Sequence, residues 1–158
     1  MTAVQSPPSA TGQIDVKAPA HRVYSLISDL PTMAGCAEEY AGHRWLDGAT
    51  SARVGARFRG RNQRGFRRWS TLSTITDADA GSRFAFEVTF LGFPIARWQY
   101  DLEPAGDGCR VTESTWDRRP AWLRYPTSLA TGVWNRAETN TGNIATTLAR
   151  LKSRAETE

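Results

Sequence analysis

Apolar and polar side chains alternate through the middle of the chain. Apolar positions recur with a period of two residues in six segments: 42–48, 54–62, 67–76, 83–90, 95–104 and 109–117. A seventh, residues 12–18, places Ile14 and Val16 between polar neighbours. Alternation with polar outer positions is typical of antiparallel strands that have one face on a core and the other in water. Most of the chain is therefore predicted to form one antiparallel sheet.

Helical spacing appears only near the two ends of the chain. Residues 20–30 carry apolar side chains on one helical face behind Pro19, and residues 31–35 favour a second short helix or a turn. After Pro126, one apolar stripe runs at helical spacing through Val133, Ala137, Thr141, Ile144, Leu148 and Leu151. Thr127 or Ser128 is the predicted N-cap of this long helix. Residues 117–126 are expected to be an irregular linker.

This order of elements predicts an α+β fold in which a curved antiparallel sheet of about seven strands wraps around the long C-terminal helix. The apolar face of such a sheet must be covered, and only the last helix is long enough to cover it. Packing is predicted to be tight near Leu148 and looser near Asn140, where a cavity is expected.

Size and composition indicate a single domain. The 158 residues suffice for one core, with residues 1–10 expected to be a disordered tail and residues 11–158 the domain. The two cysteines and two histidines have no metal-ligand spacing, so no metal and no cofactor are predicted. No apolar run could span a membrane and no signal peptide is seen, which favours a cytoplasmic protein.

The chain resembles the SRPBCC superfamily, also called START-like or helix-grip proteins. The resemblance covers about residues 12–153 and rests on IDVKAPAHRVYSLISDLPTM, WLDGA followed by VGARFRG, SRFAFEV, RWQYDLEP, GCRVTES and TLARLK. It is strongest to the bacterial polyketide cyclase/dehydrase branch. It implies an internal apolar cavity between the sheet and the last helix, and it implies no universal catalytic residue.

The inner faces of the predicted strands and helix supply the candidate ligand-binding residues. Rings and small hydroxyl groups mix on these faces, which suits a planar apolar ligand that carries oxygen atoms. The predicted set is Trp45, Phe58, Trp69, Thr71, Ser73, Phe84, Phe86, Trp98, Tyr100, Val111, Glu113, Thr115, Val133, Trp134, Ala137 and Asn140.

Glu113 is the candidate with the most chemical interest. It shares the inward face with Val111, and a buried carboxyl group must be paired, hydrogen-bonded or protonated. One interpretation is a ligand anchor or general acid/base, acting with Tyr100 or Asn140 as the other catalytic candidates. The other is a structural role, either an ion pair with an inward arginine such as Arg68 or exposure near the rim after a register shift.

Seven arginines lie between Arg53 and Arg68, and no Asp or Glu occurs from Gly48 to Thr76. Alternation places Arg57, Arg59 and Arg61 on the face of the strand that points away from Phe58. This favours a solvated outer face that prevents the strands from pairing with other sheets. Nucleic acid is the less favoured partner, because the aromatic side chains lie on the other face. A transient contact with anionic membrane lipid stays open as a third interpretation.

The favoured function is the binding of a small hydrophobic molecule, namely a lipid, a polyketide or an aromatic metabolite. The first alternative is a cyclase/dehydrase-type enzyme that uses the same cavity and works mainly by positioning. The second is nucleic-acid or anionic-surface binding through the hairpin Arg57–Arg68. Monomer and homodimer are both left open.

Overall fold

The computed structural model describes residues 6–157, which form one seven-stranded antiparallel sheet and four helices. The strands are β1 (Ala10–Val16), β2 (Tyr40–Trp45), β3 (Arg57–Arg64), β4 (Arg67–Asp79), β5 (Arg83–Phe90), β6 (Phe93–Ala105) and β7 (Gly108–Asp117). The helices are α1 (Ala20–Ile27), α2 (Leu30–Cys36), α3 (Ala121–Thr131) and α4 (Arg136–Thr157). The predicted fold class is therefore confirmed.

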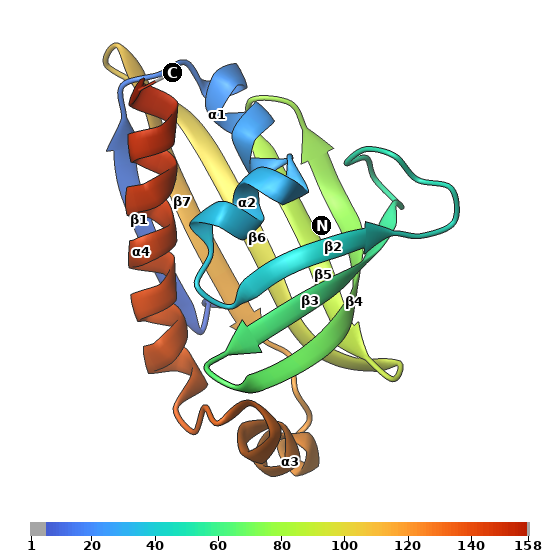
Figure 1. Ribbon diagram of the computed structural model, residues 1–158. Coiled ribbons are helices and arrows are strands. Elements are labelled where there is room, and N and C mark those ends of the chain that lie inside the picture. Colours follow the sequence, from blue (N-terminus) through green and yellow to red (C-terminus); the bar gives the residue numbers. More distant parts are fainter. Residues whose placement is uncertain (1–5, 158) are drawn as a thin grey trace.

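The strand order in the sheet is β1-β7-β6-β5-β4-β3-β2, so β1 joins the last strand and β2 forms the far edge. Figure 1 shows the sheet curving away from α4, with α1 and α2 lying between the helix and the β2 edge. Short turns connect β3 through β7, whereas residues 46–56 form a longer loop between β2 and β3. At the start of this loop, Asp47 and Gly48 take left-handed backbone angles. Such a turn at Asp-Gly is the one that the sequence predicts.

The core fills the end of the fold where α4, α1 and the sheet meet. Ile144, Leu148 and Leu151 of α4 are almost completely buried there, together with Val23 and Ile27 of α1. Tight packing at this end is what the sequence predicts. Cys36 and Cys109 are both buried and free.

The C-terminal region differs from the prediction. The expected linker is partly helical, because residues 121–131 form α3 with Pro126 inside it. Gly132 then takes a left-handed conformation with φ of 74°, which ends α3 and separates it from α4. A single helix starting at residue 127 is therefore wrong, and the long helix begins at Arg136.

The buried face of the long helix agrees with the prediction only in part. The buried positions of α4 are Asn140, Ile144, Thr147, Leu148, Leu151 and Ala155. Ala137 and Thr141 are exposed, so the predicted stripe is wrong at its N-terminal end. Its first position, Val133, lies outside α4, so helical spacing does not apply there.

The N-terminal segment makes more contacts than a disordered tail would. Residues 1–5 of that predicted tail lie outside the described residues. Ser6 accepts a hydrogen bond of 2.6 Å from Trp116 Nε1, and the backbone N–H of Ser9 donates to the Thr115 carbonyl oxygen at 2.8 Å. The ordered domain therefore includes residues 6–10.

Candidate functional site

A cavity of about 270 Å³ lies between the inner face of the sheet and helices α2, α3 and α4. Most of its wall is apolar, with the rings of Phe58, Trp69, Phe86 and Trp98 on the sheet side. Leu30 and Met33 of α2 line the opposite side. The wall thus combines flat aromatic surfaces from the strands with flexible aliphatic side chains from a helix.

Glu113 and Tyr100 form a buried polar pair in this wall. The two residues are directly opposite each other on β7 and β6, and Tyr100 Oη donates a 2.8 Å hydrogen bond to Glu113 Oε1. The Glu113 side chain is almost completely buried, and its second oxygen, Oε2, has no hydrogen-bond partner among the described residues. A buried polar atom without a partner is uncommon and costly, so Oε2 is a site where a ligand could bind.

Burial determines the protonation of this pair. It raises the pKa of Glu113 to about 8, and the hydrogen bond from Tyr100 opposes that shift only in part. Burial and the neighbouring carboxyl group also raise the pKa of the Tyr100 phenol well above its ordinary value. At neutral pH most Glu113 side chains are therefore protonated, and each can donate one hydrogen bond.

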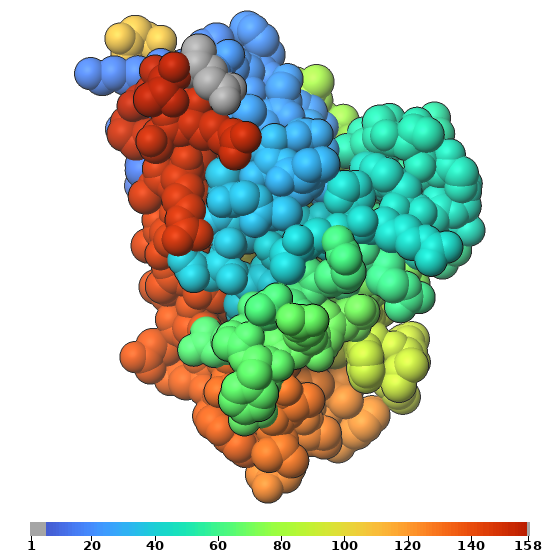
Figure 2. Space-filling model, viewed as in Figure 1, coloured from blue at the N-terminus to red at the C-terminus, as the bar shows by residue number. Residues whose placement is uncertain are grey.

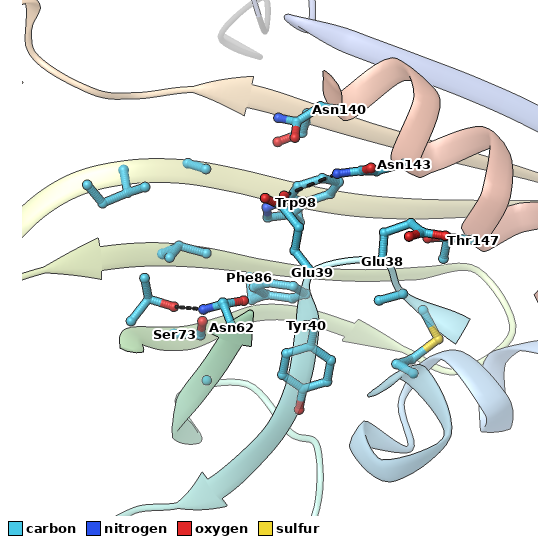
Figure 3. Close-up of a pocket in the computed structure, with 18 of the residues that line it drawn as sticks. Glu38, Glu39, Tyr40, Asn62, Ser73, Phe86, Trp98, Asn140, Asn143 and Thr147 are labelled. Atoms are coloured by element: carbon cyan, nitrogen blue, oxygen red, sulfur yellow. Dashed lines mark hydrogen bonds between the residues drawn. The ribbon is translucent and has the colours of Figure 1, made fainter. Parts of the chain in front are cut away.

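A second polar group lies where α4 approaches the start of β2. Glu39 Oε2 accepts hydrogen bonds from Arg136 at 2.7 Å and from Asn143 Nδ2 at 3.1 Å. Figure 3 shows Asn143 and Glu39 pointing toward each other beside Trp98. Glu39 Oε1 is buried without a partner among the described residues. Burial lowers the pKa of Arg136, and the neighbouring Glu39 opposes that shift.

Asn140 places a third unpartnered oxygen at the cavity. The Asn140 side chain is buried on α4, and its Oδ1 has no hydrogen-bond partner in the described part of the chain. Asn140 precedes Ile144 by one helical turn, and Ile144 packs against Gly12, the β1 partner of Glu113. At a rise of about 1.5 Å per residue, Asn140 therefore lies roughly 6 Å along α4 from the level of Glu113.

Charged groups line the α3 end of the cavity. Arg119 donates to both carboxylate oxygens of Asp117, at 2.9 Å and 2.6 Å, and to Thr127 Oγ1 at 2.9 Å. Burial acts to raise the pKa of Asp117, but the hydrogen bonds and charge of Arg119 outweigh it and the net shift is downward. Asp117 is therefore ionised at neutral pH, and this pair fastens α3 to the end of β7.

The cavity brings together eleven of the predicted ligand-binding residues: Phe58, Trp69, Thr71, Ser73, Phe84, Phe86, Trp98, Tyr100, Glu113, Thr115 and Asn140. The other five do not line it. Val111 is in the core, and Trp45 packs at 5.7 Å against the ring of Phe58. Val133 is buried outside α4.

The two other exceptions lie at the start of the long helix. Ala137 is exposed, and Trp134 exposes 61% of its surface. Trp134 precedes α4, which begins at Arg136, so helical spacing does not apply to it, and Ala137 lies in the first turn of α4. Likewise, Arg68 is exposed and does not pair with Glu113, because the carboxyl group is held by Tyr100.

Several lining residues could not be found by sequence reasoning. Glu39 and Arg119 come from loops, and Arg136 and Asn143 come from α4, so no strand alternation identifies their inner face. Polar and charged side chains such as these indicate exposure to solvent when the sequence is considered alone, and only tertiary contacts bring them into the cavity wall. Alternation with Phe58 identifies the outer stripe correctly: Arg57, Arg59 and Arg61 are all exposed.

Residues 7–156 match a sequence family described as polyketide cyclase / dehydrase and lipid transport. The chain belongs to this family. The match covers nearly the whole ordered domain, so the cavity lies within the family's common fold. A search of curated proteins found no match.

Solved structures of other proteins share the fold. Protein CV1439 from Chromobacterium violaceum superposes with a TM-score of 0.70 at 16% identity, over 94% of this chain and 96% of that chain. The Polyketide_cyc-like protein Cgl2372 from Corynebacterium glutamicum gives 0.61 at 26% identity, over 94% and 91%. The di-domain ARO/CYC StfQ from the steffimycin biosynthetic pathway gives 0.71 at 10% identity, over 92% of this chain and 49% of that one.

Two further observations concern the described residues alone. Within residues 6–157, no helix has the length and apolar character needed to cross a membrane. In the same range, no three or more His, Cys, Asp or Glu side chains lie close enough together to hold a metal ion.

Proposed function

We propose that the protein binds a compact, largely apolar molecule with a carbonyl oxygen, and that protonated Glu113 donates a hydrogen bond to this oxygen. The observation that carries the proposal is the unpartnered Oε2 of Glu113 in the wall of an otherwise apolar cavity. The pKa of about 8 makes the carboxyl group a donor at neutral pH. A ligand without an oxygen would leave this group unsatisfied, which binding sites strongly disfavour.

The size of the cavity narrows the ligand class. Its volume is about 270 Å³, near the lower limit of roughly 300 Å³ for ligand pockets. The flat rings of Trp69, Phe86 and Trp98 favour stacking on a planar molecule. These features support a small fused-ring or folded polyketide-like ligand over a long alkyl chain.

The experiment compares two probes of nearly equal shape, 2-tetralone and its parent hydrocarbon tetralin. Isothermal titration calorimetry at pH 6 should show that wild-type protein binds 2-tetralone more tightly, by about tenfold for one satisfied buried hydrogen bond. Affinity for the ketone should fall as the pH rises through about 8, where Glu113 loses its proton. Tetralin affinity should not change with pH in this way.

Two variants separate the role of Glu113 from the shape of the cavity. Glu113→Gln keeps a neutral donor, so the ketone should still bind and the loss near pH 8 should disappear. Glu113→Met removes the donor, so the preference for ketone over hydrocarbon should vanish. Equal binding of both probes by wild-type protein at pH 6 would disprove the assigned role of Glu113.

A second candidate function is a cyclase/dehydrase-type enzyme in the same cavity. A carboxyl group with a pKa of about 8 is suited to proton transfer near neutral pH, and this observation favours catalysis. 2-Tetralone provides the test because its C1 protons exchange with solvent through an enol. Protein-accelerated deuterium exchange that is lost in Glu113→Gln, with binding kept, would support the enzyme. No acceleration would favour a binding protein.

A further inference from the structure

One end of the molecule exposes large apolar side chains. Phe66, in the β3–β4 turn, exposes 88% of its surface, and Leu91, in the β5–β6 turn, exposes 82%. Helix α3 adds Trp122, Tyr125 and Leu129 to the exposed set. Figure 1 shows both turns and α3 at the same end of the fold, opposite the C-terminus of α4. We call these five residues the apolar tip.

Figure 2 shows these segments meeting as one continuous end of the surface, in green, yellow-green and orange. A ring contact joins the β5–β6 turn to α3, because Phe93 near Leu91 packs against Trp122 with ring centroids 4.9 Å apart. Tyr125 of α3 also packs at 5.6 Å against the exposed Trp134. Arg67 connects the β3–β4 turn to α3, because its guanidinium group lies over the Phe66 ring and donates a hydrogen bond to the Leu129 carbonyl oxygen at 3.3 Å.

Folding gives no reason for the exposed Leu91. Leu91 has a φ of 51°, a left-handed conformation that costs a residue with a β-carbon about 1 kcal/mol or more. Asn or Gly would fit this position better and would not expose an aliphatic side chain to water. Leu91 therefore lowers the stability of the protein through both its backbone conformation and its exposed side chain. We infer that this side chain contacts something outside the chain.

The tip is surrounded by positive charge. No Asp or Glu occurs in residues 48–76 or in residues 118–137, the segments that include the β3–β4 hairpin and α3. Arg64, Arg68 and Arg124 are exposed there. Aromatic and aliphatic side chains inside a basic border have the composition of surfaces that enter the headgroup region of anionic membranes.

We propose that the apolar tip docks on an anionic lipid surface, with Leu91 and Phe66 entering the headgroup region and the arginines contacting the lipid phosphates. A second copy of this chain is a poorer partner, because two basic borders would repel each other. Single-stranded nucleic acid also fits less well. Bases stack on rings arrayed along a groove, whereas these side chains project from two turns and a helix at one end.

The tip lies directly outside the cavity. Thr127, Ala130 and Thr131 of α3 line the cavity, while Trp122 and Tyr125 of the same helix are exposed. A membrane that contacts α3 would therefore touch a wall of the binding site. If the proposed ligand binding holds, docking places this wall where an apolar ligand can pass between lipid and cavity.

The test is flotation of the full-length protein with vesicles of phosphatidylglycerol and phosphatidylcholine, and with vesicles of phosphatidylcholine alone. Binding to the anionic vesicles is expected, and it should weaken as salt concentration rises. Leu91→Asn should reduce the partition coefficient about tenfold, since it removes one inserted aliphatic side chain. The same variant should fold at least as stably as wild-type protein, because Asn tolerates the positive φ.

Matched controls distinguish the tip from general surface properties. Val54→Ser removes an apolar side chain that is 65% exposed in the loop between β2 and β3, away from the tip, and should leave binding unchanged. Arg124→Glu should lower the partition coefficient about 25-fold, because each of two charge units counts for about fivefold. Arg59→Glu, on the outer stripe, should have a much smaller effect.

Three outcomes would overturn the proposal. The first is that the protein does not bind anionic vesicles. The second is that the Arg59 and Arg124 variants lose equal amounts of vesicle binding. The third is that the protein does not bind vesicles and Leu91→Asn instead disrupts its self-association or its binding to nucleic acid. The 2-tetralone titration keeps the two proposals separate. The variants of the apolar tip should bind 2-tetralone as the wild-type protein does. If the wild-type protein binds vesicles but not 2-tetralone, only the proposed ligand binding is contradicted.

Discussion

Tyr100 Oη and Glu113 Oε1 are 2.8 Å apart across two directly paired positions of β6 and β7, and both side chains are buried. This contact satisfies one carboxyl oxygen and leaves Oε2 for another partner. Because the strands fix both backbones, the pair is held rigidly in the cavity wall. It is the most specific chemical feature of the site.

Stability should fall as pH rises from about 4.5 to about 8, because over this interval folded Glu113 keeps a proton that the unfolded chain releases. Below the lower value both states are protonated, and above the higher value both are ionised. The full loss is on the order of 5 kcal/mol. Urea unfolding of wild-type protein at several pH values should show this slope.

Glu113→Gln is the control for this pH dependence. Gln stays neutral, so the variant should lack most of the slope and should be more stable than wild-type protein at pH 9. The pKa values of Asp117 and Glu156 are shifted downward, so their contributions change at lower pH and remain in both proteins. An unchanged slope in the variant would show that Glu113 does not keep its proton.

Tyr100→Phe should raise the pKa of Glu113 above its wild-type value of about 8, because the hydrogen bond from Tyr100 lowers it. Carboxyl carbon chemical shifts measured by NMR during a pH titration would report this change. The variant should lose about 1–3 kcal/mol of stability. The loss should be greater at pH 9, where the bond is to a charged acceptor, and an equal loss at pH 6 would contradict this.

Gly12 and Gly142 should respond oppositely to alanine. A β-carbon at Gly12 would lie 2.8 Å from Ile144 Cγ2, so Gly12→Ala must push apart β1 and α4 and should cost about 1–3 kcal/mol. A β-carbon at Gly142 would meet no atom within 4 Å, so Gly142→Ala should stabilise the helix by about 1 kcal/mol. Thermal unfolding of both variants compares them directly, and a neutral Gly12→Ala would contradict the tight contact.

Arg136→Met should destabilise the protein by about 3 kcal/mol, because it leaves the Glu39 carboxylate largely buried without its cation. The double variant with Glu39→Gln should recover much of this loss. Urea unfolding of the wild type, both single variants and the double variant gives the coupling energy. Additive losses would mean that the ion pair contributes little.

Much of the fold follows from local patterns in the sequence. Strict alternation in residues 83–90 and 95–104 sets the inward faces of β5 and β6, since a shift of one residue would turn every apolar side chain to water. The same rule places Glu113 inside and Arg59 outside. Helical spacing at Ile144, Leu148 and Leu151 likewise identifies the buried face of the last helix.

Only the tertiary structure decided what these faces meet. Residues 132–135, which begin with the left-handed Gly132, separate α3 from α4, and Trp134 among them is exposed. The choice of Tyr100 over Arg68 as the partner of Glu113 depends on the register of β6 with β7. Local sequence sets the periodicity of each element, whereas partners, protonation and surface clusters depend on which distant segments pack together.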